Sequence, residues 1–259
     1  MINFNKFHRF LRDDKDTLII KENADEIWCR PRCGSKRISK LPLTVTPELC
    51  FLAGIILGDG HLAKTKFKIT MEMTSKNIHE IVRDTFSTAF KTEFIVKIKN
   101  DKKINRKQRW KIEFKSKVIW LLFNKIFEIP YGKKSDIIRV PKVVFHSNRK
   151  CMKHFILGLF LADGGRKGKY VSFTSASEKF IEELNLLLKI VGVGSSISKW
   201  KNKKLNKRYF DLLISGNEIN KFKELIPKIN IKLNARSSRQ GYPSLVKGAG
   251  SCKVNVAAC

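Results

Sequence analysis

Two aspartates occupy matching positions in two similar stretches of the chain. Asp59 stands between two glycines at the end of the apolar run FLAGIILGDGH, and Asp163 ends the similar run FILGLFLADGG after 163 − 59 = 104 positions. An acid beside glycine after an apolar helix is ordinarily a turn residue that bonds its own backbone. An incidental turn residue has no reason to recur with the same glycine after it, so the pair predicts a shared chemical role.

Two carboxylates that meet in one place have a definite chemistry. They repel each other unless cations lie between them. Carboxylate oxygens are the hard ligands that Mg²⁺ prefers, and they also suit Mn²⁺. Such metal ions can activate a water molecule and stabilise the leaving oxygen of a phosphodiester. Asp59 and Asp163 are therefore predicted to bind a divalent metal in a strand-cleaving site.

The small residues of both runs predict how the acids come together. Gly54 and Gly58 are four positions apart, as are Gly158 and Ala162. Residues four apart share one face of a helix, so each helix has a side on which another backbone can approach closely. If the two helices pack through those sides, both acids lie at the same end of the pair.

The charge of the chain predicts a polyanionic partner. The 259 residues include 53 Lys and Arg against 23 Asp and Glu, a formal net charge of +30. A compact fold with this charge repels itself unless a polyanion is its usual partner. A membrane is not expected, because the longest apolar runs are far shorter than the ~20 residues of a spanning helix. The amino terminus mixes charges and shows no secretory signal, so we expect an intracellular nucleic-acid binder in the cytoplasm, on the nucleoid or in an organelle.

One supersecondary plan is used twice, which predicts the fold class α+β with two α-β-α-β-β-α halves. Thr46 is expected to cap the first acid-bearing helix, which begins at Pro47. The alternation in KFKITMEMT predicts a strand with Phe67, Ile69 and Met71 on its buried face. The predicted units are residues 1–47, an amino-terminal extension of unknown role; 48–150, the first half; 151–236, the second half; and 237–259, an irregular tail.

Each half also has a strongly basic turn between two alternating strands, KIKNDKKINRKQRWK in the first and KWKNKKLNKR in the second. A charge run is usually a solvated face. Here both runs fall at the corresponding turn, and a β-ribbon can lie in the major groove with its Lys and Arg on phosphates or guanine edges. The two ribbons differ, which predicts a long, asymmetric double-stranded DNA target. The predicted DNA-contacting residues on the polar faces of the sheets are Lys66, Lys68, Lys97, Lys99, Lys102, Lys103, Arg106, Lys107, Arg109, Lys111, Lys199, Lys201, Lys203, Lys204, Lys207 and Arg208.

The six cysteines fit a reducing compartment, because they are few and scattered. Cys29 and Cys33 are spaced like half of a tetrahedral zinc site. No second pair of comparable spacing follows, so free thiols are the favoured interpretation. Protein splicing is not expected, because the chain starts with Met and ends NVAAC without a His-Asn pair.

The stretches LAGIILGDG and ILGLFLADG look like two copies of the LAGLIDADG motif, and residues 46–236 resemble a monomeric, two-repeat LAGLIDADG homing endonuclease. The resemblance implies two motif helices packed at a pseudo-twofold axis. It also implies a curved antiparallel sheet in each half, the two forming a saddle over DNA. The last acid of each motif, Asp59 or Asp163, would bind the catalytic metal, assisted by the backbone carbonyls of Gly58 and Ala162.

Two features depart from the family's pattern. Leu57 and Leu161 replace the motif's earlier acid. The strand ends EMTS and TSAS carry no lysine, although the resemblance implies basic residues there that help to position water. The candidate catalytic substitutes are Lys64, Arg166, Lys133 and Lys134.

These features predict a monomeric, Mg²⁺- or Mn²⁺-dependent endonuclease that breaks both strands of DNA, of the kind encoded by a mobile intron. The alternative is a binder that does not cleave, such as an intron RNA maturase or a transcription regulator. The acid pair favours the first hypothesis, and the missing strand-end lysines favour the second. Residues 1–47 are either an added DNA-contacting module or a remnant of a host reading frame.

Overall fold

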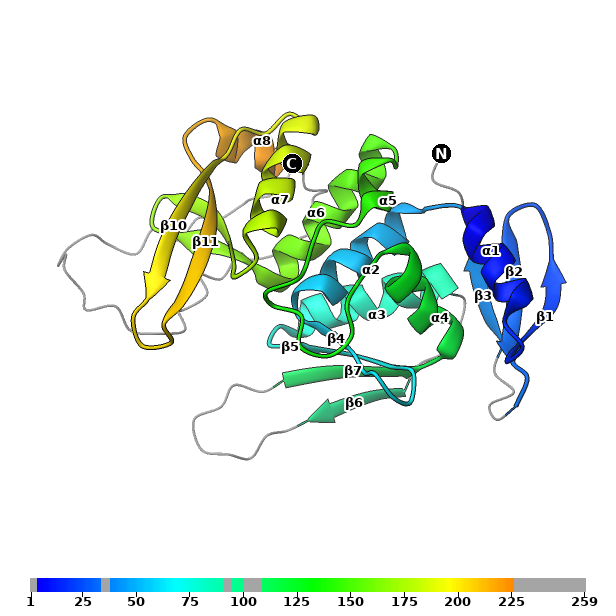
Figure 1. The fold of residues 1–259 in the computed structure, drawn as a ribbon. Helices are drawn as coiled ribbons and strands as arrows, with labels where there is room; N and C mark the ends of the chain where they lie inside the picture. The colour runs from blue at the N-terminus through cyan, green and yellow to red at the C-terminus, as the bar shows by residue number, and fades with distance from the viewer. Residues whose placement is uncertain (1–3, 34–37, 91–94, 100–108, 226–259) are drawn as a thin grey trace.

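The structure is a computed structural model that describes residues 4–33, 38–90, 95–99 and 109–225. Two helices, α2 (Pro47–Gly58) and α6 (Arg149–Asp163), lie side by side at its centre. Figure 1 shows one antiparallel sheet on each side of this helix pair, with the β6-β7 and β10-β11 hairpins reaching toward the same side of the molecule. The expected α+β class is confirmed, and so is the central position of the two motif helices.

The first half is built on a sheet with the strand order β4-β5-β7-β6. Helix α3 packs against the inner face of this sheet. A short helix and a π-helical turn close the half. After α2 its elements are β4 (Gly60–Leu62), β5 (Lys68–Met73), α3 (Lys76–Phe90), β6 (Ile95–Lys99), β7 (Arg109–Lys115), α4 (Lys117–Leu121) and η1 (Leu122–Ile126).

The second half repeats this arrangement with the sheet order β10-β11-β9-β8. A linker with one short helix, α5 (Lys142–Phe145), joins the halves. The closing helix α8 corresponds to α4, and the residues predicted to follow it, including the tail 237–259, lie outside the described part of the chain. After α6 the elements are β8 (Gly164–Lys167), β9 (Tyr170–Ser175), α7 (Glu178–Ile190), β10 (Ser196–Asn202), β11 (Lys207–Ile214) and α8 (Glu218–Leu225).

Each half has one strand more than the sequence predicted, so the order is α-β-β-α-β-β-α. The added strands β4 and β8 follow the two acids directly. They have only three and four residues, GHL and GGRK, which are too short and too rich in glycine to show an alternating pattern. Their partners hold them: Gly60 pairs with Met71, and Gly164 pairs with Phe173.

The predicted cap of α2 at Thr46 is confirmed, and α6 has a similar cap at Asn148 that was not predicted. The side chain of Thr46 accepts a hydrogen bond from the Leu49 N–H at 3.3 Å, and Asn148 accepts one from the Cys151 N–H at 2.9 Å at the start of α6. The prediction for Phe67 was wrong. Its φ is +43° and its side chain is exposed, because it lies in the turn before β5 and not on the buried face of the strand.

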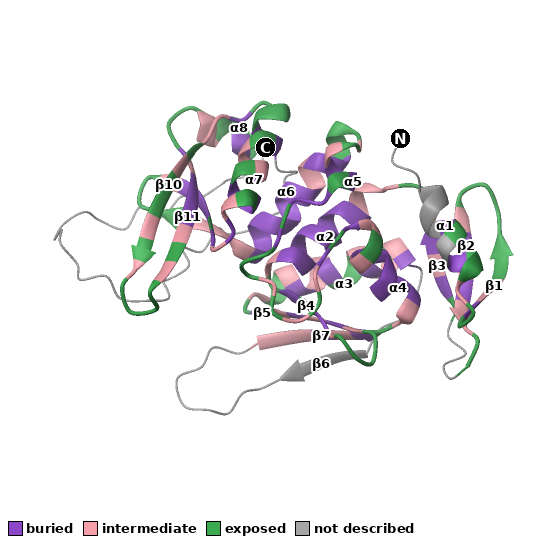
Figure 2. Cartoon of the chain, in the orientation of Figure 1, coloured by how far each residue is buried: buried purple, intermediate pink, exposed green. Residues whose placement is uncertain are grey.

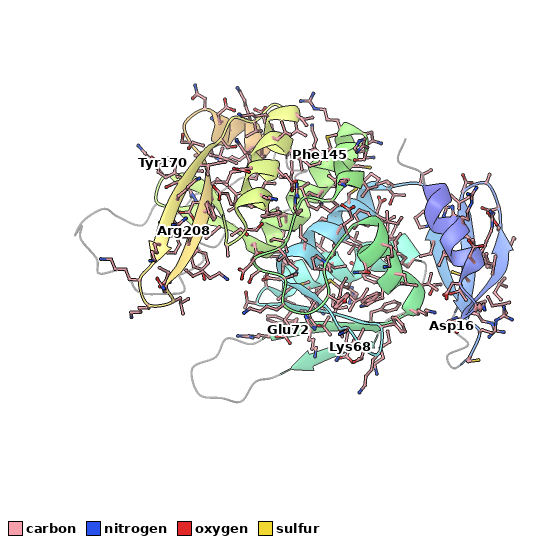
Figure 3. All side chains as sticks on the ribbon, viewed as in Figure 1. Asp16, Lys68, Glu72, Phe145, Tyr170 and Arg208 are labelled. Atoms are coloured by element: carbon pink, nitrogen blue, oxygen red, sulfur yellow. The ribbon has the colours of Figure 1, made fainter. Side chains whose placement is uncertain are left out.

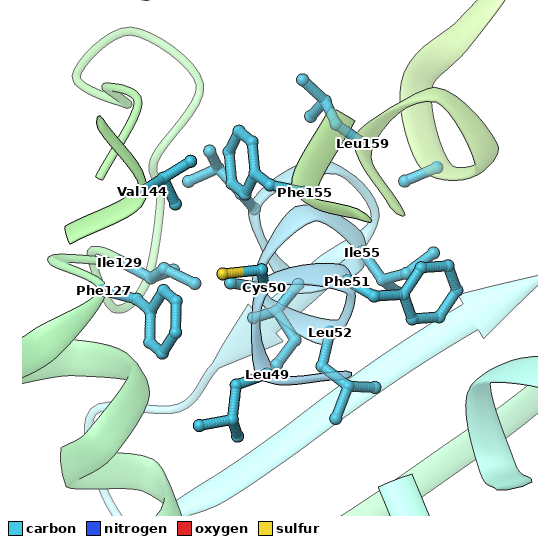
Figure 4. Close-up of a cluster of buried hydrophobic side chains, with 14 of the residues drawn as sticks. Leu49, Cys50, Phe51, Leu52, Ile55, Phe127, Ile129, Val144, Phe155 and Leu159 are labelled. Atoms are coloured by element: carbon cyan, nitrogen blue, oxygen red, sulfur yellow. The ribbon is translucent and has the colours of Figure 1, made fainter. Parts of the chain in front are cut away.

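The backbones of α2 and α6 can touch only because Gly54 and Gly158 have no side chains. A Cβ on Gly54 would come within 2.6 Å of the Leu159 nitrogen, and a Cβ on Gly158 would overlap the carbonyl oxygen of Phe51. Around this contact Phe155 and other side chains of α2, α6 and the linker form a closed apolar cluster (Figure 4). Both helices are buried over most of their length (Figure 2), and no helix in the described part of the chain is long and apolar enough to span a membrane.

The amino-terminal region is a folded unit that rests on the first half. Its sheet order is β1-β2-β3. The Lys117 ammonium bonds the carboxylates of Asp14 and Asp16 at 2.9 and 2.8 Å, and the hydroxyls of Ser39 and Ser116 are 3.1 Å apart. The unit comprises α1 (Phe4–Asp13), β1 (Thr17–Glu22), β2 (Glu26–Pro31) and β3 (Ser39–Pro42).

This unit also shows the setting of the two cysteines considered for zinc. Cys29 is buried on β2, where its Sγ donates to the Ser39 carbonyl. Burial raises the pKa of this thiol to about 12, which opposes formation of the thiolate that zinc requires. Cys33 is exposed, and the described residues contain no cluster of three side chains that could hold a metal ion.

Replacing Gly158 by Ala should lower the free energy of unfolding by about 1–3 kcal/mol, because the new methyl group forces α2 and α6 apart. The clash outweighs the gain of about 1 kcal/mol that alanine brings to a helix interior. Gly165→Ala is the matched control, since a Cβ there meets nothing within 4 Å. Urea unfolding would measure both variants, and a Gly158→Ala protein as stable as the control would contradict this helix contact.

Candidate metal and nucleic-acid site

Asp59 and Asp163 lie at the same end of the central helix pair. Asp59 follows the last residue of α2 and its N–H bonds the Ile55 carbonyl at 3.1 Å, while Asp163 is the last residue of α6. A Cβ placed on Gly58 would come within 3.0 Å of Asp163 Oδ2 and within 2.5 Å of the Ala162 Cβ. The carboxylate of one half therefore rests against the helix end of the other, as the glycine spacing predicted.

This end of the helix pair concentrates negative charge. The carboxyl end of each helix carries a partial negative charge from its free carbonyl groups. Two carboxylates add to it, and their mutual repulsion favours a bound cation. The oxygens available at the two tips, from carboxylates and backbone carbonyls, are the donor set that Mg²⁺ or Mn²⁺ prefers.

Lys134 supplies one positive charge at this place. Its Nζ donates to the carbonyl oxygens of Ile56 at 2.5 Å and Gly60 at 2.7 Å. Burial lowers the pKa of Lys134 to about 8, while Asp163 and Asp59 act in the opposite direction. The two acids therefore favour the charged form of Lys134, and its ammonium offsets part of their negative charge.

The linker that carries Lys134 is fastened to both halves. The Gly132 N–H bonds the Leu62 carbonyl at 3.0 Å in the first half. In the second half, Ser177 donates to the Ile138 carbonyl at 2.8 Å, and Asp136 forms an ion pair with Lys207. These bonds on either side hold Lys134 at the helix tips.

A cavity of about 220 Å³ opens beside the acid pair. Its polar lining comes from the linker, the end of α6 and the second sheet, and the other lining side chains are apolar. The polar lining residues are Lys134, Ser135, Asp163, Thr174, Ser175, Lys207 and Tyr209.

The other predicted catalytic residues, Lys64, Lys133 and Arg166, are exposed. Lys64 is exposed in the turn after β4, the strand that leads away from Asp59. Lys133 is exposed on the linker. Arg166 pairs with Val171, so the register places it on the helix-covered face of the second sheet. Their catalytic roles stay predictions, and Lys134 is the predicted residue that the structure brings to the acids.

The polar face of the first sheet carries basic residues that alternate with two acids. Arg109 contacts Glu72 at 3.4 Å, and Lys111 contacts Glu113 at 3.3 Å. Lys68 of β5 lies 3.7 Å from Glu113, and Figure 3 labels Lys68 and Glu72 at this sheet. The register pairs Lys97 with Lys111 and Lys99 with Arg109. Lys66 is exposed in the turn before β5, and Lys102, Lys103, Arg106 and Lys107 lie outside the described residues.

In the second sheet the predicted basic residues divide between two faces. Lys199 pairs with the buried Phe210 and bonds Glu178 of α7, so it belongs to the helix-covered face. Lys201 and Arg208 pair with each other and share that face by alternation. The prediction that Lys199, Lys201 and Arg208 lie on the polar face was wrong, because successive side chains of a strand point to opposite faces of the sheet. Lys207 lies on the polar face as predicted, and Lys203 and Lys204 are exposed in the turn.

Sequence reasoning missed Lys167, Trp200 and Tyr209 on the polar face of the second sheet. Trp200 stacks on Tyr209 with ring centroids 5.0 Å apart, and the Lys167 ammonium lies 5.7 Å from the Trp200 ring centroid. The signal was present in the alternation of KWKN and KRYF. The aromatic residues were not predicted because the basic charge of this run dominated its interpretation.

The central helix pair with one sheet on each side is the fold class of the LAGLIDADG homing endonucleases. The structure matches the fold of the homing endonuclease I-DmoI: a complex with target DNA and Mn aligns with a TM-score of 0.52 and 18% identity over 73% of this chain and 97% of that chain. A structure from a study of mesophilic I-DmoI variants aligns with a TM-score of 0.50 and 18% identity over 73% of this chain and 99% of that one.

The sequence comparison agrees with this class. Residues 150–227 match the family model described as LAGLIDADG-like domain. This span covers α6 to α8 and includes Asp163. The second half therefore carries the recognisable domain, and the first half repeats its order of elements.

The curated relatives are much longer than this chain. A probable translation initiation factor IF-2 of Thermococcus kodakarensis is 26% identical over 217 residues, which is 80% of this chain and 17% of that protein. A glutamine–fructose-6-phosphate aminotransferase of Methanocaldococcus jannaschii is 30% identical over 186 residues, 71% of this chain and 16% of that protein. A ribonucleoside-diphosphate reductase alpha subunit of Bacillus subtilis is 26% identical over 216 residues, 78% and 19%. The chain spans less than a fifth of each relative, and their names describe unrelated activities.

Replacing Lys134 by Met should lower the free energy of unfolding by about 1–3 kcal/mol, because the carbonyls of Ile56 and Gly60 lose a charged donor and the acids lose a nearby cation. The neighbouring Lys133→Met is the control, because Lys133 is exposed and its loss should change stability by less than about 0.5 kcal/mol. Thermal unfolding followed by circular dichroism would compare them. Equal effects of the two changes would show that Lys134 does not hold the helix tips.

Proposed function

We propose that this chain is a site-specific DNA endonuclease that uses a divalent metal to hydrolyse both strands. The observation that carries the proposal is the pair of carboxylates, Asp59 and Asp163, held together by the α2-α6 contact beside Lys134. The net charge of +30 and the basic polar face of the first sheet support a DNA partner. The DNA and Mn named for the I-DmoI complexes of the same fold support the same partner and metal.

In this proposal each residue at the helix tips has a defined task. Asp59 and Asp163 would hold Mg²⁺ or Mn²⁺ with the backbone carbonyls of Gly58 and Ala162, and the bound ion would supply an acidified water and stabilise the leaving oxygen. Lys134 keeps part of the acid charge neutral while no ion is bound. It also remains a cation near the position of the phosphate, where developing negative charge is stabilised.

One chain carries both acids and both sheets, so we propose that a monomer acts on an asymmetric target. Two different sheets need not read identical half-sites, whereas identical subunits would favour a palindrome.

A binder that does not cleave, such as an intron RNA maturase or a transcription regulator, is the second candidate. The observation in its favour is the character of the strand ends near the acids. β5 ends with Met73 before Thr74, and β9 ends with Ser175. Neither end supplies the basic residue that the resemblance implies.

Asp59→Asn and Asp163→Asn should each abolish double-strand cleavage and leave DNA affinity nearly unchanged, because an amide has a similar shape but is a poor ligand for a hard metal. Asp25→Asn, an exposed change in the β1-β2 turn, is the control and should cut normally. Cleavage would be followed with Mg²⁺ on a plasmid that bears a target site selected from a randomised DNA library. Binding to the same site would be measured by fluorescence anisotropy without Mg²⁺. Normal cleavage of both strands by either Asn variant would exclude that acid as a metal ligand.

Binding to DNA should weaken steeply with salt, because lysines and arginines that neutralise phosphates release condensed counterions. Arg109→Ala should reduce the slope of log K against log salt by up to about 1 if its guanidinium touches a phosphate, or relax one base preference if it touches a guanine. Lys189→Ala, at the exposed end of α7, should change neither. A nearly flat salt dependence of the unaltered protein would contradict a nucleic-acid partner.

A further inference from the structure

The polar face of the second sheet contains a buried carboxylate that the metal site does not use. Asp211 of β11 is only 1% exposed. Its Oδ2 accepts from Lys167 Nζ at 2.5 Å, and its Oδ1 accepts from Thr174 Oγ1 at 2.6 Å. A buried carboxylate is costly unless it is paired and hydrogen-bonded, so these two partners are needed where Asp211 lies.

The register shows which side of the sheet this group occupies. Asp211 pairs with Thr174 on β9 and with Ser198 on β10. Its neighbours Phe210 and Leu212 are buried on the other face, beneath the helices of the second half. Neighbouring side chains of the polar face, and not the helix layer, therefore cover Asp211.

The arrangement holds Lys167 in one place while leaving it open to a ligand. The side chain of Lys167 is 58% exposed although its ammonium bonds a carboxylate that is buried. An ammonium has three donors, so a lysine with one donor on Asp211 keeps others for a ligand. A lysine that is already ordered loses less conformational freedom when it binds than one that moves freely.

The aromatic residues next to Lys167 limit the positions that its ammonium can take. The Trp200 ring lies 5.7 Å from Lys167 Nζ and stacks on Tyr209 at an interplanar angle of 20°. In the first sheet the basic side chains pair instead with partly exposed acids, as in Arg109 with Glu72. The second sheet thus presents a fixed donor beside an apolar surface, and the first presents exchangeable ion pairs.

We propose that Lys167 is a specificity-determining residue for the DNA half-site under the second sheet, and that Asp211 is its positioning residue. The ammonium donates to acceptor atoms on a base edge in the major groove, where O6 and N7 of guanine are the usual partners of lysine. The Trp200–Tyr209 pair provides apolar contact to the neighbouring sugar or thymine methyl group. This inference rests on the proposed DNA-binding function and adds to it a base-reading role for residues outside the acid pair.

The test uses a target site that the purified full chain selects from a randomised DNA library. It measures the affinity of the chain for every single-base substitution of that site. The unaltered protein should prefer one base by about 5- to 150-fold at one or two adjacent positions of the second half-site. Asp211→Asn keeps the shape and an acceptor for Thr174 but releases Lys167, so this preference should fall to nearly 1 while affinity for the other sites is kept. The double variant Lys167→Met with Asp211→Asn removes the donor without leaving a buried charge, and it should lose the same preference.

Lys169→Met is the matched control, because Lys169 is exposed in the β8-β9 turn two residues away, and it should keep the full profile. Circular dichroism confirms the folding of each variant. A uniform loss of affinity with an unchanged base profile would show that Lys167 touches only phosphate. A relaxed base preference in the first half-site would show that Lys167 does not contact the half-site under the second sheet. Either result overturns the inference and leaves the proposed nuclease intact, whereas an unaltered protein without any sequence preference would overturn both.

Discussion

The close contact between the backbones of α2 and α6 positions both the two acids and the two sheets. Gly54 and Gly158 leave no side chain between the helices, and the Leu159 nitrogen and the Phe51 carbonyl occupy the space instead. Because the helices touch, their ends also touch, and Asp163 rests against Gly58. The two sheets then lie on either side of the joined tips (Figure 1). Wider separation of the helices would part the acids and spread the sheets.

The same contact concentrates negative charge at the helix tips. Two carboxylates lie at two helix ends of negative polarity, and the partly buried Lys134 beside them has its pKa lowered by burial to about 8. Such clusters of acids beside a lysine with a perturbed pKa are common where a protein binds a cation or a charged substrate. The +30 charge of the whole chain has the opposite sign and suits a polyanion. Local negative charge for a metal within an overall positive surface for DNA is the charge distribution that the proposed function needs.

The sequence predicted the helix contact, the position of the acids and the start of α2, because glycine spacing and capping residues act locally. It did not reveal β4 and β8, whose three and four residues are strands only through pairing with β5 and β9. It also placed Lys199, Lys201 and Arg208 on one surface with Lys207, although alternation turns them to the other face. Lys134 could be named as a candidate from the sequence, but its bonds to Ile56 and Gly60, 78 and 74 residues earlier, come from the tertiary fold. The Asp211–Lys167 pair is missed for the same reason, since its members are 44 residues apart.

We propose that the acid pair makes this chain a metal-dependent nuclease. The most direct measurement is incubation of the protein with a randomised duplex DNA library, with Mg²⁺ or Mn²⁺ in one sample and EDTA in the other, followed by sequencing of both bound and cleaved molecules. We expect one long asymmetric sequence to be enriched among the bound molecules in both samples and to be cut on both strands only when metal is present. Enrichment of a bound sequence that stays uncut with either metal would contradict this proposal and leave a DNA-binding protein without nuclease activity.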